Sequence, residues 1–211
     1  MYGCEIIVGG AASGKTRLLK ERIREFEKEG GGNILFVCTT GTIRYLGLHD
    51  DFYVITPENM AISECKNKTA VEIIPDTSSV KHQKDIAKFI YEYSQINACE
   101  NNGRTMVVVD DAPNILGTEL ISLLIKQPIY SKMIFTIQSP LQLEQLENMS
   151  GISLDERFSG FVYWHIHKLD KTNECFHQQN GAGWKKMKFP ECFKEPEVIK
   201  KRGRKTNSNI T

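Results

Sequence analysis

The sequence predicts an α/β fold in which a mainly parallel central sheet is flanked by helices. Two observations lead to this prediction. Nearly continuous apolar segments, typical of buried parallel strands, alternate with amphipathic helical segments between residues 5 and 149. A glycine-rich stretch, 9–16, lies directly between the first apolar segment and the first helical segment. That order of strand, glycine loop and helix is typical of sheets that bind a phosphorylated ligand.

The glycine-rich stretch matches the P-loop pattern G-x-x-x-x-G-K-[ST] at every fixed position. A β-branched strand at 5–8 precedes it, and the following helix is predicted from Thr16 to Lys28, before a glycine triplet. We expect Lys15 to reach the β- and γ-phosphates of a nucleotide and the Thr16 hydroxyl to ligate Mg²⁺. The loop amides and the helix N-terminus would hold phosphate oxygens, so the predicted nucleotide-binding residues are Gly9, Gly10, Ala11, Ala12, Ser13, Gly14, Lys15, Thr16 and Arg17.

Two carboxylates follow a second apolar strand, at 105–109. Asp110 closes this strand, where a Walker B acid is expected, and would hold Mg²⁺ through water. Asp111 is placed to orient and deprotonate an attacking water. The alternative is that the two acids only cap the turn that begins at Ala112 and Pro113.

Gln138 ends a third apolar strand, which is predicted to begin at Met133 and to stop at Pro140. Ligands of parallel sheets bind at the carboxyl ends of the strands, so the polar residues after Val8, Val109 and Ile137 should lie together. Gln138 would then hold the attacking water or sense hydrolysis, and a solvent-facing amide is the alternative. The remaining predicted strands are 33–40, 52–55 and 70–74, and the remaining predicted helices are 80–97, 116–126 and 141–149, with a short helix left open at 59–68.

The segment from 161 to 178 predicts a β-hairpin whose turn centres on Lys171. In that register two pairs of potential zinc ligands share one face of the hairpin, His165 with His177 and His167 with Cys175. A half-exposed polar face is the alternative, because the opposite face is apolar. We predict two regions, a P-loop domain with this hairpin at 1–190 and a basic, flexible tail at 191–211.

The tail has more than one interpretation. Its basic run at 200–205 could hold DNA phosphates, solubilise the chain or contact an acidic partner. Arg202-Gly203-Arg204 resembles the core of an AT-hook, which would enter the minor groove.

Composition fits a single globular domain of 211 residues, with 40% hydrophobic and 25% charged residues and a net charge of +1. No apolar run approaches the ~20 residues that span a bilayer, and the first strand begins too early to leave room for a signal peptide. We therefore expect a cytoplasmic protein without membrane insertion. The six cysteines form no C-x-x-C pair, which indicates free thiols.

The P-loop at 9–16, the strand and acid pair at 107–111 and the glutamine strand at 135–140 resemble the FtsK/HerA superfamily of DNA-pumping ATPases. The resemblance covers about residues 3 to 180 and is most like the viral genome-packaging branch. It implies a P-loop NTPase fold of the RecA/FtsK-like kind. Asp111 stands where family members commonly carry Glu, and Ile137 separates a threonine from a glutamine that the family places side by side.

This resemblance implies an ATP-hydrolysing translocase that packages double-stranded DNA into a viral capsid, with ATP and Mg²⁺ as cofactors. It implies a homo-oligomeric ring, usually a hexamer, and possible contacts with capsid or portal-vertex proteins. Each active site would be completed by an arginine from a neighbour. Arg157 is the first choice for this arginine finger, and the rivals are Arg44, Arg104 and Lys132.

Two other functions remain open on sequence grounds. A small P-loop kinase would need an arginine-rich lid, and no such segment is evident. A nucleotide-dependent assembly or switch ATPase, similar to the zonula occludens toxin-like phage proteins, usually carries a membrane segment after its core. No guanine-selecting N-K-x-D motif is present, so ATP is expected rather than GTP.

Overall fold

A computed structural model of the chain describes residues 3–39, 53–65, 70–75, 80–100, 104–126, 131–152, 162–165, 174–179, 183 and 185–188. These residues form one nine-stranded sheet in the order β3-β4-β2-β5-β6-β1-β7-β8-β9. The strands are β1 (Gly3–Val8), β2 (Asn33–Val37), β3 (Tyr53–Ile55), β4 (Ala70–Ile73), β5 (Thr105–Val109), β6 (Ser131–Ile137), β7 (Val162–His165), β8 (Glu174–Gln179) and β9 (Lys185–Lys188).

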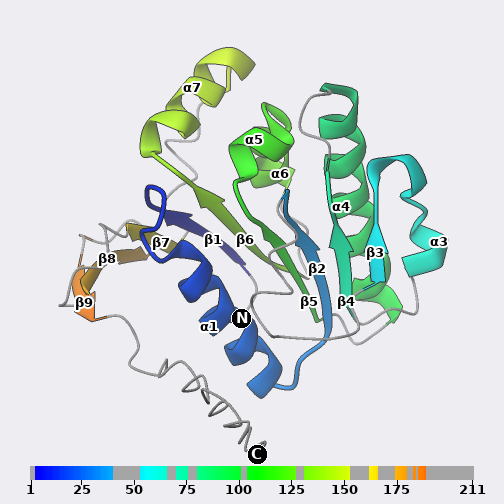
Figure 1. Cartoon of the computed structure of the whole chain (residues 1–211), viewed down its shortest axis with the longest axis horizontal. Helices are drawn as coiled ribbons and strands as arrows, with labels where there is room; N and C mark the ends of the chain where they lie inside the picture. Colours follow the sequence, from blue (N-terminus) through cyan, green and yellow to red (C-terminus); the bar gives the residue numbers. More distant parts are fainter. Residues whose placement is uncertain are drawn as a thin grey trace, which may run out of the picture.

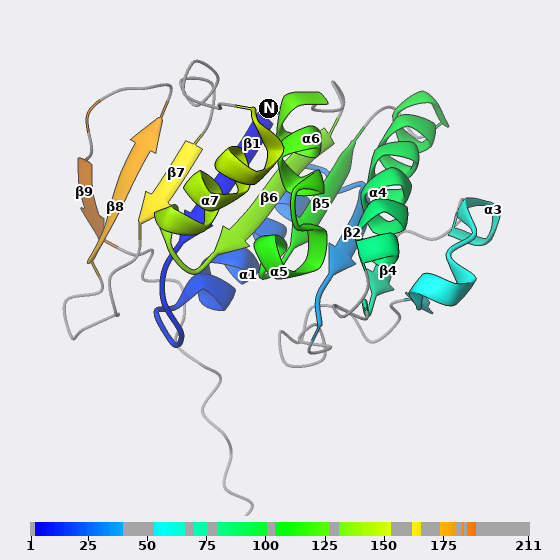
Figure 2. The same cartoon turned by 90° about the horizontal axis from the view of Figure 1, so that it is seen from above.

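The sheet is mainly parallel, as predicted. All strands from β3 to β7 in the sheet order pair in parallel, and β8 and β9 add two antiparallel strands at one edge (Figure 2). Strand β6 lies between β1 and β5, although it comes after both in the chain. The three segments that carry the predicted nucleotide chemistry are therefore neighbours in the sheet.

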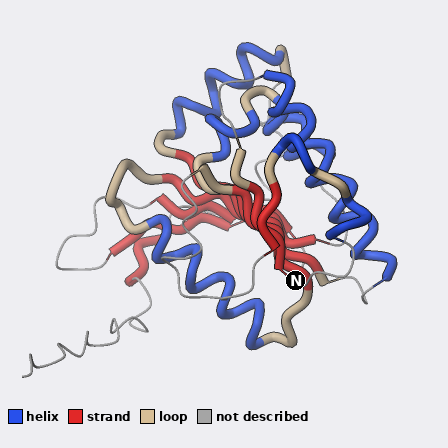
Figure 3. Tube along the Cα trace, turned by 45° about the vertical axis from the view of Figure 1, so that its right-hand side comes forward, coloured by secondary structure: helices blue, strands red, loops and turns tan. Residues whose placement is uncertain are grey.

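Helices cover both faces of this sheet (Figure 3). Helix α1 (Lys15–Lys28) packs on one face. On the other face lie α4 (Val80–Glu100), α5 (Ala112–Leu116), α6 (Glu119–Lys126) and α7 (Pro140–Ser150), while the short η1 (Pro57–Asn59) and α3 (Ile62–Cys65) lie near β3 (Figure 1). None of the helices within the described ranges is long and apolar enough to cross a membrane.

Two apolar cores hold the layers together. Leu18, Leu19 and Ile23 of α1 pack against alternate residues of the central strands, among them Ile7. Residues of opposite parity, such as Ile6 and Val8, belong to the larger core beneath α4 to α7. Because successive strand residues point to opposite faces, strands buried on both faces appear in the sequence as continuous apolar runs.

Most predicted elements are found within a few residues of their expected ends, with two exceptions. The helix predicted at 116–126 begins only at Glu119, as α6, because Gly117 has a positive φ of 52° and ends a separate short helix, α5, that was not predicted. Strand β9 was not predicted. Residues 40 and 52, at the ends of two predicted strands, lie outside the described residues, as does the predicted tail at 191–211.

The predicted hairpin is present as β7 and β8, but its register is not the predicted one. His165 pairs with Phe176, and His177 pairs with Trp164. The predicted pairing of His165 with His177 is therefore wrong by one residue, and such a slip exchanges the two faces of a strand. A tight turn fixes register, whereas a connection from 166 to 173 does not. The observed register is not the one that the predicted zinc cluster required, and His167 lies outside the described residues.

The first prediction concerns Gly32, which joins α1 to β2. Its φ is 150°, and a Cβ there would lie 2.2 Å from the backbone oxygen of Arg104. That oxygen accepts a hydrogen bond from the Asn33 amide at 3.0 Å, so it cannot withdraw without opening the start of the β2–β5 pair. We expect Gly32→Ala to lower the free energy of unfolding by about 2–4 kcal/mol.

Urea denaturation measures this loss, and Gly151→Ala is the matched control. Gly151 also has a positive φ, 69°, but a Cβ there would meet no atom within 4 Å. Its substitution should cost only the left-handed conformation, about 1–2 kcal/mol. Equal losses for the two variants would contradict the close approach at Gly32.

Candidate nucleotide-binding site

The predicted P-loop connects β1 to α1 at the carboxyl edge of the sheet (Figure 1). The Gly9 amide donates to the Ile137 oxygen at 3.1 Å, which ties the start of the loop to the end of β6. The loop then turns through Ala12 and Gly14, with φ values of 56° and 104°. Gly14 occupies the position before the first residue of α1, so the loop leads directly into the helix N-terminus.

Lys15 lies across this loop. Its Nζ donates to the Gly9 oxygen at 2.6 Å and to the Gly10 oxygen at 2.9 Å. Partial burial lowers the pKa of Lys15, while the nearby carboxylates of Asp110 and Asp111 act in the opposite direction. The ammonium thus lies in the electrostatic field of both predicted acids and close to the loop that would hold phosphates.

The two acids are held by one hydroxyl from the neighbouring strand. Thr136 Oγ1 of β6 donates to Asp110 Oδ1 at 2.6 Å and accepts from the Asp111 amide at 2.7 Å. The Asp110 amide donates to the Val37 oxygen at 2.9 Å, which extends the β5–β2 pairing by one bond. The acid pair is therefore fixed from both neighbouring strands.

Asp111 has an uncommon backbone conformation, with φ of 61° and ψ of 46°. For a residue other than glycine this left-handed conformation is strained, and such residues often occur at functional sites. The Asp111 carboxylate accepts from Asn114 Nδ2 at 2.7 Å and from Gln138 Nε2 at 3.4 Å. Asp111 occupies the N-cap position of α5, but its side chain makes no hydrogen bond to the helix amides. Helix capping therefore does not explain why an acidic residue stands at this position.

Gln138 lies just beyond β6 with an exposed side chain that reaches Asp111. Its backbone amide donates to Gln142 Oε1 at 2.8 Å. Ser139 caps α7 and accepts from the Leu141 amide, so the helix begins directly after Gln138. The structure therefore brings Lys15, the acid pair and Gln138 together from three segments of the chain.

The remaining predicted residues that the structure describes fall into two groups, those beside Lys15 and those away from the site. Thr16 and Arg17 are in the first turn of α1 and are partly buried. Arg157 and Arg44 lie outside the described residues. Arg104 precedes β5 at the opposite edge of the sheet, where it donates to the Glu29 oxygen, contacts the Glu29 carboxylate at 3.3 Å and lies over the Phe26 ring.

Lys132 is near the start of β6, at the same opposite edge, and its Nζ is 3.9 Å from Glu5 Oε2. The guanidinium of Arg104 and the ammonium of Lys132 thus have carboxylate partners within the chain. Neither group lies at the edge that carries the P-loop.

Sequence reasoning missed two functional candidates, Thr136 and Asn114. The spacing of Thr136 and Gln138 contains a usable signal, because residues two apart on a strand share a face. Ile137 between them is fully buried in the core under α7, and its oxygen accepts the bond from Gly9. Because one residue separates Thr136 from Gln138, both polar side chains lie on the same side as the acids.

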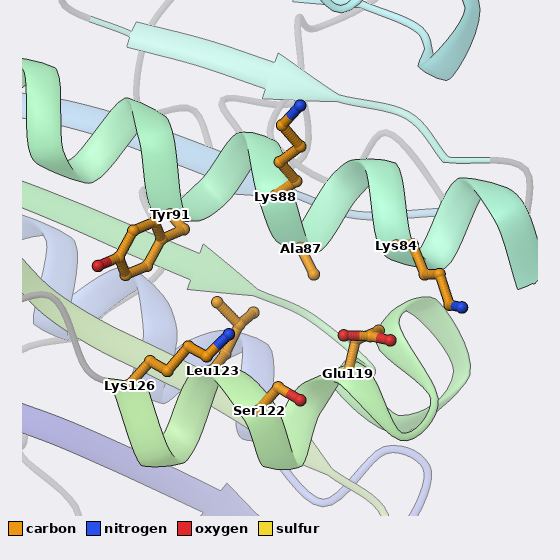
Figure 4. Close-up of a pocket in the computed structure, with 8 residues that line it drawn as sticks. All are labelled: Lys84, Ala87, Lys88, Tyr91, Glu119, Ser122, Leu123 and Lys126. Carbon is orange, nitrogen blue, oxygen red and sulfur yellow. The ribbon is translucent and has the colours of Figure 1, made fainter.

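A hollow of about 350 Å³ lies between α4 and α6 (Figure 4). Lys84, Lys88 and Lys126 line it together with Glu119 and Tyr91. It shares no residue with the P-loop, the acid pair or Gln138. This hollow is therefore separate from the candidate nucleotide site.

Comparison with known proteins gives matches in structure alone. No protein-family model matches the chain, and no curated protein matches it in sequence. The genome packaging NTPase B204 from Sulfolobus turreted icosahedral virus 2, in complex with ATPγS, superimposes with a TM-score of 0.56 at 12% identity. That match covers 89% of this chain and 97% of B204.

Two further structures are similar. The DNA-packaging ATPase B204 from Sulfolobus turreted icosahedral virus gives a TM-score of 0.53 at 12% identity, over 88% of this chain and 97% of that chain. The KaiC-like protein PH0186 from Pyrococcus horikoshii OT3 gives 0.50 at 18% identity, over 87% and 84%. With the strand–loop–helix unit at β1 and α1, these matches show that the chain has the fold of a P-loop NTPase.

Proposed function

We propose that this protein is an ATPase that hydrolyses ATP with Mg²⁺. The observation that carries the proposal is the convergence of Lys15, the acid pair at 110–111 and Gln138 at one edge of the sheet. These are the group types that phosphoryl transfer requires, namely a phosphate-binding cation, metal-holding oxygens and groups that orient water. The similar B204 structure in complex with ATPγS supports the same assignment.

The loop residues account for binding of the triphosphate. Backbone amides of 9–14 and the N-terminus of α1 would surround the phosphate oxygens. Lys15, which in this structure donates to the Gly9 and Gly10 oxygens, would exchange these acceptors for the β- and γ-phosphates. Thr16 and Asp110 would supply the hard oxygen ligands that suit Mg²⁺, Thr16 directly and Asp110 through water. When bound, the ion would neutralise charge that develops on the phosphates.

Asp111 and the side-chain amide of Gln138 would carry out the hydrolysis step. Water attacks the γ-phosphorus, the bond from the γ-phosphorus to the bridging oxygen breaks, and ADP and phosphate leave. Asp111 accepts the proton that the water loses, and Gln138 orients the water beside it. The bond between Gln138 Nε2 and Asp111 Oδ1 at 3.4 Å is long, so the amide can exchange it for water at little cost.

The second prediction tests nucleotide hydrolysis itself. We expect Lys15→Ala to reduce ATP turnover by about 10²-fold or more and to weaken nucleotide binding, because the charge that neutralises the phosphates is lost. A phosphate-release assay measures turnover, and a fluorescent ATP analogue measures binding. Lys28→Ala, at the exposed far end of the same helix, is the matched control. Similar rates for the Lys15 variant and the wild type would disprove the site.

The third prediction separates binding from chemistry. Asp111→Asn and Gln138→Ala should retain ATP affinity and slow turnover by about 10- to 10³-fold, because both groups act on water rather than on the phosphates. Gln145→Ala, an exposed glutamine on α7, is the control for the loss of an amide. If either variant lost ATP binding instead, its assigned role would be wrong.

The finer function that we propose is translocation of double-stranded DNA in the packaging of a viral genome. Its support is the similarity to structures described as a genome packaging NTPase and a DNA-packaging ATPase. The basic run at 200–205 would add DNA affinity that falls with salt. We further propose a homo-oligomeric ring in the cytoplasm of the host cell, with Arg157 of each chain completing the site of its neighbour and with capsid or portal proteins as partners.

The fourth prediction tests this coupling. Duplex DNA should stimulate the ATPase severalfold, and removal of the positive charges at 200–205 by glutamine substitution should weaken DNA binding and reduce its salt dependence. The assay compares ATP hydrolysis with and without duplex DNA, at two salt concentrations, for the wild type and the tail variant. Hydrolysis that is indifferent to DNA would instead favour a switch ATPase, and phosphate transfer to a small molecule would favour a kinase.

A further inference from the structure

Thr136 is a buried polar residue in a strand whose other central residues are apolar. Its exposed fraction is 0%, and its neighbours in β6 from Met133 to Ile137 are otherwise hydrophobic. A hydroxyl in such a position loses its hydration and needs partners in the protein. Its two partners are the side chain of Asp110 and the backbone of Asp111.

The bond to Asp110 orients a carboxylate. Thr136 donates its proton to Asp110 Oδ1 at 2.6 Å, a short distance that is typical of a hydrogen bond to an ionised oxygen. This bond occupies Oδ1 and restrains the rotation of the carboxylate. Asp110 Oδ2 is then the oxygen that can accept from a water bound to a metal.

The bond to Asp111 holds a strained backbone. The amide of Asp111 donates to the same hydroxyl at 2.7 Å, and the residue has a φ of 61°. In this conformation the carboxylate lies between the amides of Asn114 and Gln138. One hydroxyl therefore gives the two adjacent carboxylates different orientations, Asp110 toward β6 and Asp111 toward Gln138.

We propose that Thr136 is a positioning residue for ATP hydrolysis, which assigns Asp110 to the metal and Asp111 to the attacking water through its single hydroxyl. This inference rests on the proposed function. Thr136 does not touch the reacting atoms and acts through the two acids. Its loss should therefore change turnover and the dependence on metal more than it changes the affinity for nucleotide.

The test compares Thr136→Val, which keeps the shape and removes the hydroxyl, with Thr136→Ser, which keeps the hydroxyl. For the valine variant we expect kcat to fall about 10- to 100-fold, with the KM for ATP within about threefold, because a bond to a charged group is lost. The Mg²⁺ concentration for half-maximal activity should rise. The serine variant should remain within about threefold of the wild type in both quantities.

Thr105→Val is the matched control. Thr105 is a buried threonine at the far end of the neighbouring strand β5, and its hydroxyl has no hydrogen-bond partner among the described residues. Its substitution should leave kcat and the Mg²⁺ dependence unchanged. If Thr136→Val does not fold, Thr136→Ala and Thr136→Ser give the same comparison, since they differ by one hydroxyl.

The outcomes separate this inference from the proposed function. A wild-type protein that hydrolyses ATP, together with a valine variant of normal kcat and Mg²⁺ dependence, would overturn the role of Thr136 alone. A valine variant with a lower melting temperature and normal turnover would also overturn it, because the hydroxyl would then only join β5 to β6. A wild-type protein that does not hydrolyse ATP would overturn the proposed function, and this inference with it.

Discussion

The pairing of β6 with both β1 and β5 is the constraint on which the rest of the molecule depends. Residues 132–137 of β6 are in register with 3–8 of β1, and residues 131–135 are in register with 105–109 of β5. All three strands run in one direction, so their carboxyl ends meet at one edge of the sheet. The bonds from Gly9 to Ile137 and from Thr136 to Asp110 extend the two pairings beyond the last strand residues.

Local sequence was enough to predict the pieces of this arrangement. The P-loop, the apolar runs of β1, β5 and β6 and the amphipathic α1 each have a pattern that depends on their own residues. The order of the strands could not be read in the same way, because pairing joins residues far apart in the chain, such as Gly3 with Lys132 and Thr105 with Ser131. Thr136 escaped notice for this reason, because its partner Asp110 lies on another strand. Asn114 is only three residues from Asp111, but its bond to that carboxylate accompanies the left-handed backbone of Asp111, which the sequence pattern does not reveal.

Strands β7, β8 and β9 also show that sequence patterns predict strands better than they predict pairing. The apolar and aromatic content of 161–167 predicted a strand, and this prediction is confirmed by β7. The register of β7 with β8 was predicted from a turn at Lys171 and is wrong, because β7 also pairs with β1 and β8 also pairs with β9, and these long-range pairings cannot be read from the hairpin sequence. Strand β9 has the sequence Lys-Lys-Met-Lys, which lacks the alternation of a half-buried strand. Lys185 and Lys186 are exposed on this edge strand, and lysine at an edge hinders unwanted pairing between sheets.

Charge balance gives the proposed ring a physical basis. A triphosphate beside Asp110 and Asp111 would bring a large negative charge to one edge of the sheet, which Lys15 cannot balance alone. A bound Mg²⁺ would reduce this excess. Two other cations considered for the role, Arg104 and Lys132, lie at the opposite edge beside Glu29 and Glu5. An arginine from a second copy would supply the remaining charge when the γ-phosphate leaves, and this would make turnover depend on assembly.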